Sequence, residues 1–237
     1  MLNAFVYIIE SPSDADLLDG RSEGRSLCEA LRIADIPHWY SLATTRKAFQ
    51  SSLRERLVAA LSHFNVQPGG SVPSRLPILH LSMHGNNAGI SLTCGEFIAW
   101  EDLRQELSTL TNSMQGGLLI CMSSCFGSSG CRMAMHERPD HPFWALVGNK
   151  DSVPWADAVV GYIVFYHSFF KNVLIGECVD RMKLASGDAN FCWHHGPSVK
   201  NDWVLFTQLS KSQEILAGLQ AVTPNDATSD SSGTTTV

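Results

Sequence analysis

The strongest constraint on this chain is an alternation of two sequence patterns along most of its length. Short, continuous apolar runs recur, and the segments between them carry apolar residues at helical spacing. A strand covered by helices on both faces is apolar throughout rather than at every second position. The runs lie at 4–11, 38–43, 78–83, 117–124 and 143–148. The alternation therefore predicts a mostly parallel sheet between two helical layers, a three-layer α/β/α sandwich.

The segments between and after the runs predict the helices. The stripe residues of the three clearest segments are Leu27, Ala30, Leu31 and Ala34; Phe49, Leu53, Leu57, Ala60, Leu61 and Phe64; and Trp155, Val159, Tyr162, Ile163, Tyr166 and Phe170. Two later segments, 173–186 and 203–220, should complete the helical cover of the sheet. Within 89–107 we expect a hairpin around Cys94-Gly95 and a helix that starts near Trp100.

Length and composition indicate one globular domain. A chain of 237 residues, 44% hydrophobic and 17% charged, can build a single α/β core, which we place at 1–222. Residues 223–237 lack the apolar side chains needed for folding, so they predict a disordered tail. We find no internal repeat.

Charge and cysteine content exclude several classes of protein. The formal net charge is −6 and no Lys/Arg run occurs, which argues against a nucleic-acid partner. No stretch reaches the roughly 18 apolar residues of a membrane span, and no secretory signal is recognisable. Seven cysteines do not resemble a disulfide scaffold. We expect a cytoplasmic protein without a membrane partner, in which most thiols are buried in the core.

Two apolar runs end in residues that can carry chemistry. The third run ends in His84-Gly85, and the fourth ends in Cys125, which lies 41 residues after His84. The carboxyl ends of parallel strands meet at one edge of a sheet, and neighbouring strands lie about 4.8 Å apart. We therefore expect the imidazole and the thiol to lie close together.

A histidine beside a cysteine suits nucleophilic catalysis. The imidazole favours the thiolate, which is the reactive form of cysteine, and can then protonate a leaving amine. Gly85 allows a substrate carbonyl to approach the backbone closely. The backbone N–H groups of Gly85 and Cys125 are the natural candidates for an oxyanion hole.

The motifs at these two strand ends resemble the caspase-hemoglobinase fold of cysteine peptidases. This group includes caspases, metacaspases, separase, gingipains and the bacterial CHAT-domain proteases. The hairpin, the run at 143–148 and the segment 153–172 resemble the order of elements in the CHAT-like branch, and the resemblance covers roughly residues 4–171. The Gln and Arg that caspases place around the nucleophile are absent, so cleavage after aspartate is not implied. The metacaspase acid two residues before the nucleophile is replaced by Ser123.

The resemblance implies a cysteine endopeptidase with Cys125 as nucleophile and His84 as general base and acid. It also suggests a bacterial immune or cell-death setting such as antiviral defence, with one dedicated protein substrate. A gasdermin-like protein or another immune effector would be such a substrate, and activation would come from a partner protein, oligomerisation or the substrate. The alternative is a catalytically inactive caspase-fold module that binds proteins, with His84 and Cys125 as remnants.

Acidic residues near the expected site suggest a substrate preference. In this fold the primary pocket draws on the end of the first strand, which offers Glu10, Asp14 and Asp16. Ser123 and Asp151, near the ends of the fourth and fifth runs, are further candidates for substrate binding. An acidic pocket would favour a basic side chain before the scissile bond.

Other residue clusters give weaker signals. The chain has no phosphate-binding loop, and the glycines at 127–130 do not match a serine-hydrolase elbow. Two groups of Cys and His residues resemble zinc ligands: Cys121, Cys125, Cys131, His136 and His141, and a second cluster at 192–196. Neither group contains a C-x₂-C pair, so we expect no metal and no cofactor. His80, inside the third run, should belong to the core.

Overall fold

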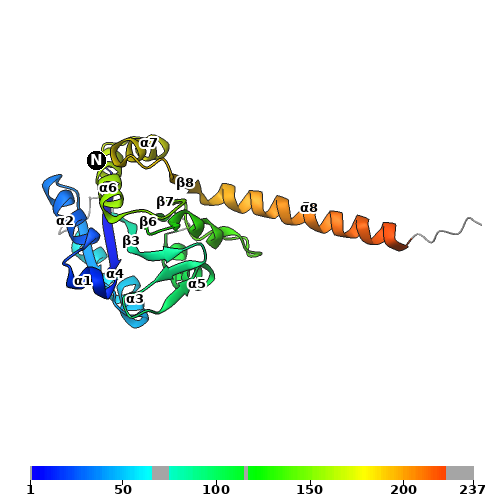
Figure 1. The fold of residues 1–237 in the computed structure, drawn as a ribbon, viewed down its shortest axis with the longest axis horizontal. Helices are drawn as coiled ribbons and strands as arrows, with labels where there is room; N and C mark the ends of the chain where they lie inside the picture. Colours follow the sequence, from blue (N-terminus) through cyan, green and yellow to red (C-terminus); the bar gives the residue numbers. More distant parts are fainter. Residues whose placement is uncertain (1, 66–74, 115–116, 223–237) are drawn as a thin grey trace, which may run out of the picture.

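A computed structural model describes residues 2–65, 75–114 and 117–222. The described chain forms a mixed sheet with helices on both faces (Figure 1), in the main strand order β2-β1-β3-β6-β7-β8. The strands on this path are β1 (Ala4–Ser11), β2 (His38–Leu42), β3 (Leu76–Asn86), β6 (Leu119–Ser123), β7 (Ala145–Asn149) and β8 (Phe191–His195). All neighbours on the path are parallel except β7 and β8. The three-layer α/β fold expected from the sequence is confirmed.

The side chains of β1 show why the strand is apolar throughout. Phe5, Tyr7 and Ile9 point into one core cluster, whereas Val6 and Ile8 point into another. The first cluster lies under α3 (Arg46–Leu53), α4 (Glu55–Asn65) and α5 (Trp100–Ser113), and the second under α2 (Glu23–Ile33), α6 (Trp155–Phe169) and α7 (Ile175–Ser186). Because successive strand residues face opposite sides, both faces of β1 are buried.

Smaller elements lie at the carboxyl edge of the sheet. Helix α1 (Asp14–Leu18) follows β1 and begins with a capping box between Ser13 and Asp16. Strand β3 runs on beyond the sheet and pairs with β4 (Gly89–Ser91), which pairs with β5 (Phe97–Ala99). The expected hairpin is thus present, with Gly95 in the left-handed region at its turn. A 3₁₀ segment, η1 (Gly127–Ala134), follows β6.

The structure differs from the sequence expectation in three places. The stripe at 49–64 is divided between α3 and α4 at Arg54. Strand β8 was not expected, because its three polar residues resemble a ligand cluster more than a strand. Helix α8 (Gly196–Val222) starts earlier than expected and extends away from the sheet instead of covering it (Figure 1). The predicted tail at 223–237 lies outside the described residues.

Among the described residues, no helix combines the length and the apolar character that crossing a bilayer requires.

Candidate active site

The register of the sheet places His84 and Cys125 at equivalent positions. Ser82 of β3 pairs with Ser123 of β6, and the two strands are direct neighbours. His84 and Cys125 therefore each lie two residues beyond the same pair, at the carboxyl edge of the sheet. Both are partly exposed, whereas Ser82 and Ser123 are buried. The structure thus brings together the two strand ends that the sequence singled out.

Gly85 shows how closely the two strand ends approach each other. A Cβ atom at this position would lie 3.1 Å from the carbonyl oxygen of Cys125 and 3.2 Å from the Cβ of Ser124. It would also lie 3.1 Å from the carbonyl oxygen of Gly89. A side chain at position 85 would therefore crowd the backbone of Cys125, so glycine suits this close approach.

Trp155, the first residue of α6, and Val153, in the loop before it, each contact one of the two candidate residues. The ring of Trp155 lies edge-on to the imidazole of His84, with 5.3 Å between ring centroids. The Sγ of Cys125 lies 4.0 Å from the carbonyl oxygen of Val153. Two residues that are close in the chain therefore contact the imidazole and the thiol, respectively.

Asp16 adds a third side chain that the sequence did not connect with His84. Its Oδ2 atom lies 2.9 Å from the Nε2 atom of His84, and Asp16 is buried although His84 is half exposed. The same oxygen accepts a hydrogen bond from the hydroxyl of Ser13 over 2.6 Å. The capping box of α1 thus holds the carboxylate in place beside the imidazole.

The surroundings of Asp16 keep its side chain ionised. Burial by itself raises the pKa of the carboxyl, but the hydrogen bonds from Ser13 and His84 outweigh burial and lower it. A carboxylate can only accept hydrogen bonds, so Nε2 of His84 must carry the proton between them. Nδ1 is then the unprotonated nitrogen in the neutral ring, available as a base.

The backbone around Cys125 leaves one donor free. The N–H groups of Phe126 and Gly127 donate to the carbonyl oxygens of Asp151 and Ser124, respectively. Within the described part of the chain, the N–H of Cys125 donates to no protein acceptor. Phe126 adopts a left-handed conformation, with φ 55°, which turns the chain sharply after the nucleophile candidate. This arrangement suits an oxyanion donor at Cys125.

Close contact between Gly148 of β7 and Gly127 of η1 supports the sharp turn after Cys125. A Cβ at Gly148 of β7 would lie 2.6 Å from the nitrogen of Ser128 and 2.7 Å from the carbonyl carbon of Gly127. The backbone of η1 therefore rests directly on β7, and no larger residue fits at position 148.

The acidic residues expected to form a substrate pocket take different roles. Glu10 is 1% exposed and accepts hydrogen bonds from Ser22, Tyr40 and the backbone of Gly24, so it anchors the start of α2 and cannot reach a substrate. Asp16 is occupied by His84 and Ser13 rather than pointing into a pocket. The assignment of both to substrate binding is corrected accordingly.

The remaining substrate-binding candidates divide by exposure. Ser123 is 1% exposed, so its hydroxyl does not reach the surface, and this assignment is corrected as well. Asp14 on α1 and Asp151 after β7 are both exposed at the carboxyl edge of the sheet. The carboxylate of Asp151 accepts a hydrogen bond from the backbone of Ser152. Of the five candidates, Asp14 and Asp151 are therefore the ones exposed at this edge.

His80 lies in the core, as expected. It is fully buried, with Nδ1 3.0 Å from the hydroxyl of Tyr166 and Nε2 3.4 Å from the carboxylate of Glu23. These contacts connect β3 with α6 and α2 beneath the sheet edge, which marks His80 as a structural histidine.

A polar cluster that the sequence did not predict lies beneath η1. Nε2 of His194 on β8 is 2.8 Å from the hydroxyl of Ser128, and the thiol of Cys192 lies 3.1 Å from the same hydroxyl. Burial lowers the pKa of His194, which keeps the ring neutral. Among the residues that the structure describes, no group of three or more His, Cys, Asp or Glu side chains is placed to hold a metal ion.

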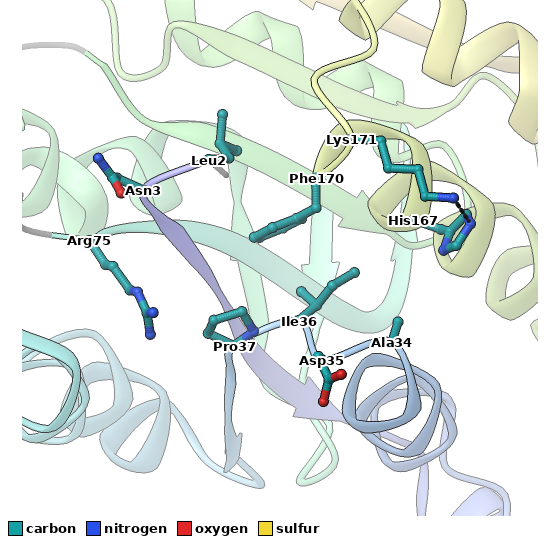
Figure 2. Close-up of a pocket in the computed structure, with 10 residues that line it drawn as sticks. All are labelled: Leu2, Asn3, Ala34, Asp35, Ile36, Pro37, Arg75, His167, Phe170 and Lys171. Carbon is teal, nitrogen blue, oxygen red and sulfur yellow. Dashed lines mark hydrogen bonds between the residues drawn. The ribbon is translucent and has the colours of Figure 1, made fainter.

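A surface pocket of about 310 Å³ lies at the opposite edge of the sheet. Figure 2 shows Phe170, Pro37 and Ile36 along its apolar side, with Lys171 hydrogen-bonded to His167. Its residues precede β1, β2 and β3 or end α2 and α6, so it is separate from the edge that carries His84 and Cys125.

Comparison with known proteins gives no match at the level of sequence. No protein-family model matches the chain, and no curated protein is significantly similar to it.

Proposed function

We propose that this chain is a cysteine endopeptidase of the caspase-like, CHAT-like type, in which Cys125 is the nucleophile and His84 the general base. The observation that carries the proposal is the contact of Asp16 with Nε2 of His84 on the strand end beside Cys125. Aspartate, histidine and cysteine then follow one another across one sheet edge. A buried carboxylate that orients an imidazole beside a nucleophile is the recurring arrangement of acyl-transfer enzymes.

The proposed reaction begins with proton transfer. Nδ1 of His84 takes the thiol proton of Cys125, and the thiolate attacks the carbonyl carbon of the scissile peptide bond. The carbonyl oxygen becomes an oxyanion, which the N–H groups of Cys125 and Gly85 stabilise. Collapse of this intermediate breaks the C–N bond as the imidazolium protonates the leaving amine. Water, deprotonated by His84, then hydrolyses the thioester, which returns the thiol and releases a carboxylic acid.

In this proposal Asp16 acts as a positioning residue rather than a base. Its carboxylate keeps the proton on Nε2, which leaves Nδ1 free to accept the thiol proton, and it stabilises the imidazolium that forms. Trp155 restricts rotation of the ring from the other side.

The resemblance seen in the sequence supports a biological setting for the proposal. We infer a cytoplasmic protease of a bacterial immune or cell-death module, with a gasdermin-like protein or another effector as its substrate. Exposed Asp14 and Asp151 favour a basic residue before the scissile bond. Faster cleavage after neutral residues than after Lys or Arg would contradict this preference.

One observation favours an inactive binding module as the second candidate. The contact recorded for Sγ of Cys125 is the carbonyl oxygen of Val153, not the imidazole of His84. Catalytic hydrogen bonds are often long before substrate binds, so this geometry does not exclude the peptidase.

The proposal is tested by incubating the purified chain with a peptide library and with bacterial cell extract. We expect new peptide termini, which should disappear with Cys125→Ala and with His84→Ala. Cys94→Ala is the matched control, because it removes an exposed thiol from the β4–β5 turn. If the wild type cuts no peptide, but both it and Cys125→Ala retain the same protein from the extract, the binding module is supported instead.

A further inference from the structure

Helix α8 leaves the body of the protein soon after it begins (Figure 1). Its first turns pack on η1 and β8, where Lys200 donates to the carbonyl oxygen of His136 and Trp203 lines a pocket with Cys131 and Met135. From Lys211 to 217 every residue is exposed. This stretch of the helix therefore stands in solvent without cover from the rest of the described chain.

Helix α8 carries several large apolar side chains that are exposed. The exposed fractions are 57% for Leu205, 69% for Phe206, 65% for Leu209, 64% for Ile215 and 59% for Leu216. At 3.6 residues per turn, Leu205, Leu209 and Leu216 lie within about 40° of one another around the helix axis. We call these three residues the α8 stripe; Phe206 and Ile215 flank it on either side.

A helix of this composition is not expected to persist alone in water. Helices in proteins gain most of their stability from packing of an apolar face, and an exposed helix needs many ion pairs between successive turns instead. The charged residues of α8 are Lys200, Asp202, Lys211 and Glu214, and no salt bridge joins any two of them in the described part of the helix. Something must cover the α8 stripe for the helix to hold its shape.

The spacing of the stripe favours another helix as the cover. Leu205, Leu209 and Leu216 are four and seven residues apart, as the a and d positions of a coiled coil are. An interfacial membrane helix would have a polar face rich in Lys and Arg, whereas the two lysines of α8 are balanced by two acids. Residues 223–237 are too poor in apolar side chains to cover the stripe themselves.

We propose that α8 pairs with α8 of a second copy of this chain through the α8 stripe. In such a pair the exposed leucines of the two copies would pack against one another, with Phe206 and Ile215 along the two sides of the seam. The same stripe meets itself across a twofold axis, so the assembly closes at two copies. The inference is independent of the peptidase proposal.

The test is the mass of the full chain in solution, measured by sedimentation equilibrium over a wide concentration range. We expect the mass to rise from one chain to two with concentration, with no further increase. Leu209→Glu combined with Leu216→Glu should hold the protein at the mass of one chain at every concentration. The thermal unfolding midpoint of the double variant should stay near that of the wild type, since the stripe lies outside the core.

Leu184→Glu is the matched control, because Leu184 on α7 is 85% exposed but lies outside the α8 stripe. This variant should dimerise as the wild type does. A wild type that remains one chain at all concentrations overturns the proposal, whether or not it binds lipid vesicles or another protein. Equal loss of the dimer in Leu184→Glu overturns it too, because association would then not depend on α8.

Discussion

Nε2 of His84 lies 2.9 Å from Oδ2 of Asp16, although the two residues are 68 positions apart in the chain. Asp16 belongs to the first helix after β1, and His84 lies near the end of β3, the strand that pairs with β1. Parallel pairing of the two strands brings both to one edge. The contact keeps the proton on Nε2 and leaves Nδ1 as the basic nitrogen of the neutral imidazole, so it is the most informative target for mutation.

Asp16→Asn should lower the rate of peptide cleavage by roughly 10²-fold or more, with a smaller effect on KM. An amide can donate to Nε2 of His84, which would move the ring proton to Nδ1 and remove the base. Steady-state kcat and KM on a cleaved peptide measure the effect. A structural role alone would lower the unfolding free energy without changing kcat of the folded enzyme, so an unchanged kcat would refute the assignment.

The same carboxylate should make stability depend on pH. The pKa of Asp16 is lower in the folded protein than its ordinary value, so Asp16 stabilises the fold above its unfolded pKa, near 3.9. This contribution is lost as the pH falls through the lower, folded pKa. Urea unfolding between pH 6 and pH 3 should therefore show a smaller loss of stability in Asp16→Asn than in the wild type. Parallel curves for the two proteins would contradict the expectation.

The thiols should differ sharply in reactivity under native conditions. Burial raises the pKa of Cys28 to about 11, that of Cys121 to about 12 and that of Cys178 to about 11, so these thiols stay protonated and protected. Cys94 is exposed and Cys125 is partly exposed. Brief treatment with iodoacetamide followed by peptide mass spectrometry should label the last two first.

His84→Ala gives this labelling experiment its control. If the imidazole assists the thiol, alkylation of Cys125 should slow in the variant while that of Cys94 stays the same. Equal rates at Cys125 in both proteins would favour the inactive binding module.

The fold could be predicted from the sequence because each strand on the path except β8 corresponds to an apolar run. The run that contains Phe5 and Val6 is apolar at successive positions only because helices cover both faces. Strand β8 was missed since its edge position leaves Trp193 and both histidines partly exposed, which removes the apolar signal.

The site was predictable only in part. His84 and Cys125 follow strands whose ends can be read directly, so parallel topology brings them together. Asp16 was recognised as an acidic residue near the site, but its direction depends on the capping box of a five-residue helix. Glu10 is another acidic residue near the end of β1, yet its carboxylate accepts a hydrogen bond from the backbone of Gly24 and anchors the start of α2. Local spacing does not distinguish two such carboxylates.

The support beneath the nucleophile turn should be sensitive to a single methyl group. Gly148→Ala would place a Cβ within 2.7 Å of two backbone atoms of η1, which cannot move without disturbing the turn after Cys125. We expect a loss of about 1–3 kcal/mol in the free energy of unfolding, the usual range for overpacking. Chemical denaturation measures it. Gly95→Ala serves as the comparison for crowding, because a Cβ there meets no atom within 4 Å, although its left-handed backbone adds strain.

The two histidines of β3 should separate fold from chemistry. His80→Ala removes the hydrogen-bond partner of buried Glu23, whose Oε1 atom already lacks a hydrogen bond within the described residues, so both carboxyl oxygens would be left without a partner in the core. We expect His80→Ala to lower the free energy of unfolding by about 1–3 kcal/mol. His84 is half exposed, so His84→Ala should change stability by less than about 1 kcal/mol while abolishing cleavage. Urea titration of both variants, with a cleavage assay below the unfolding transition, gives the comparison. Retained cleavage in His84→Ala would remove the histidine from the mechanism, and full stability in His80→Ala would show that the pair with Glu23 does not hold the core together.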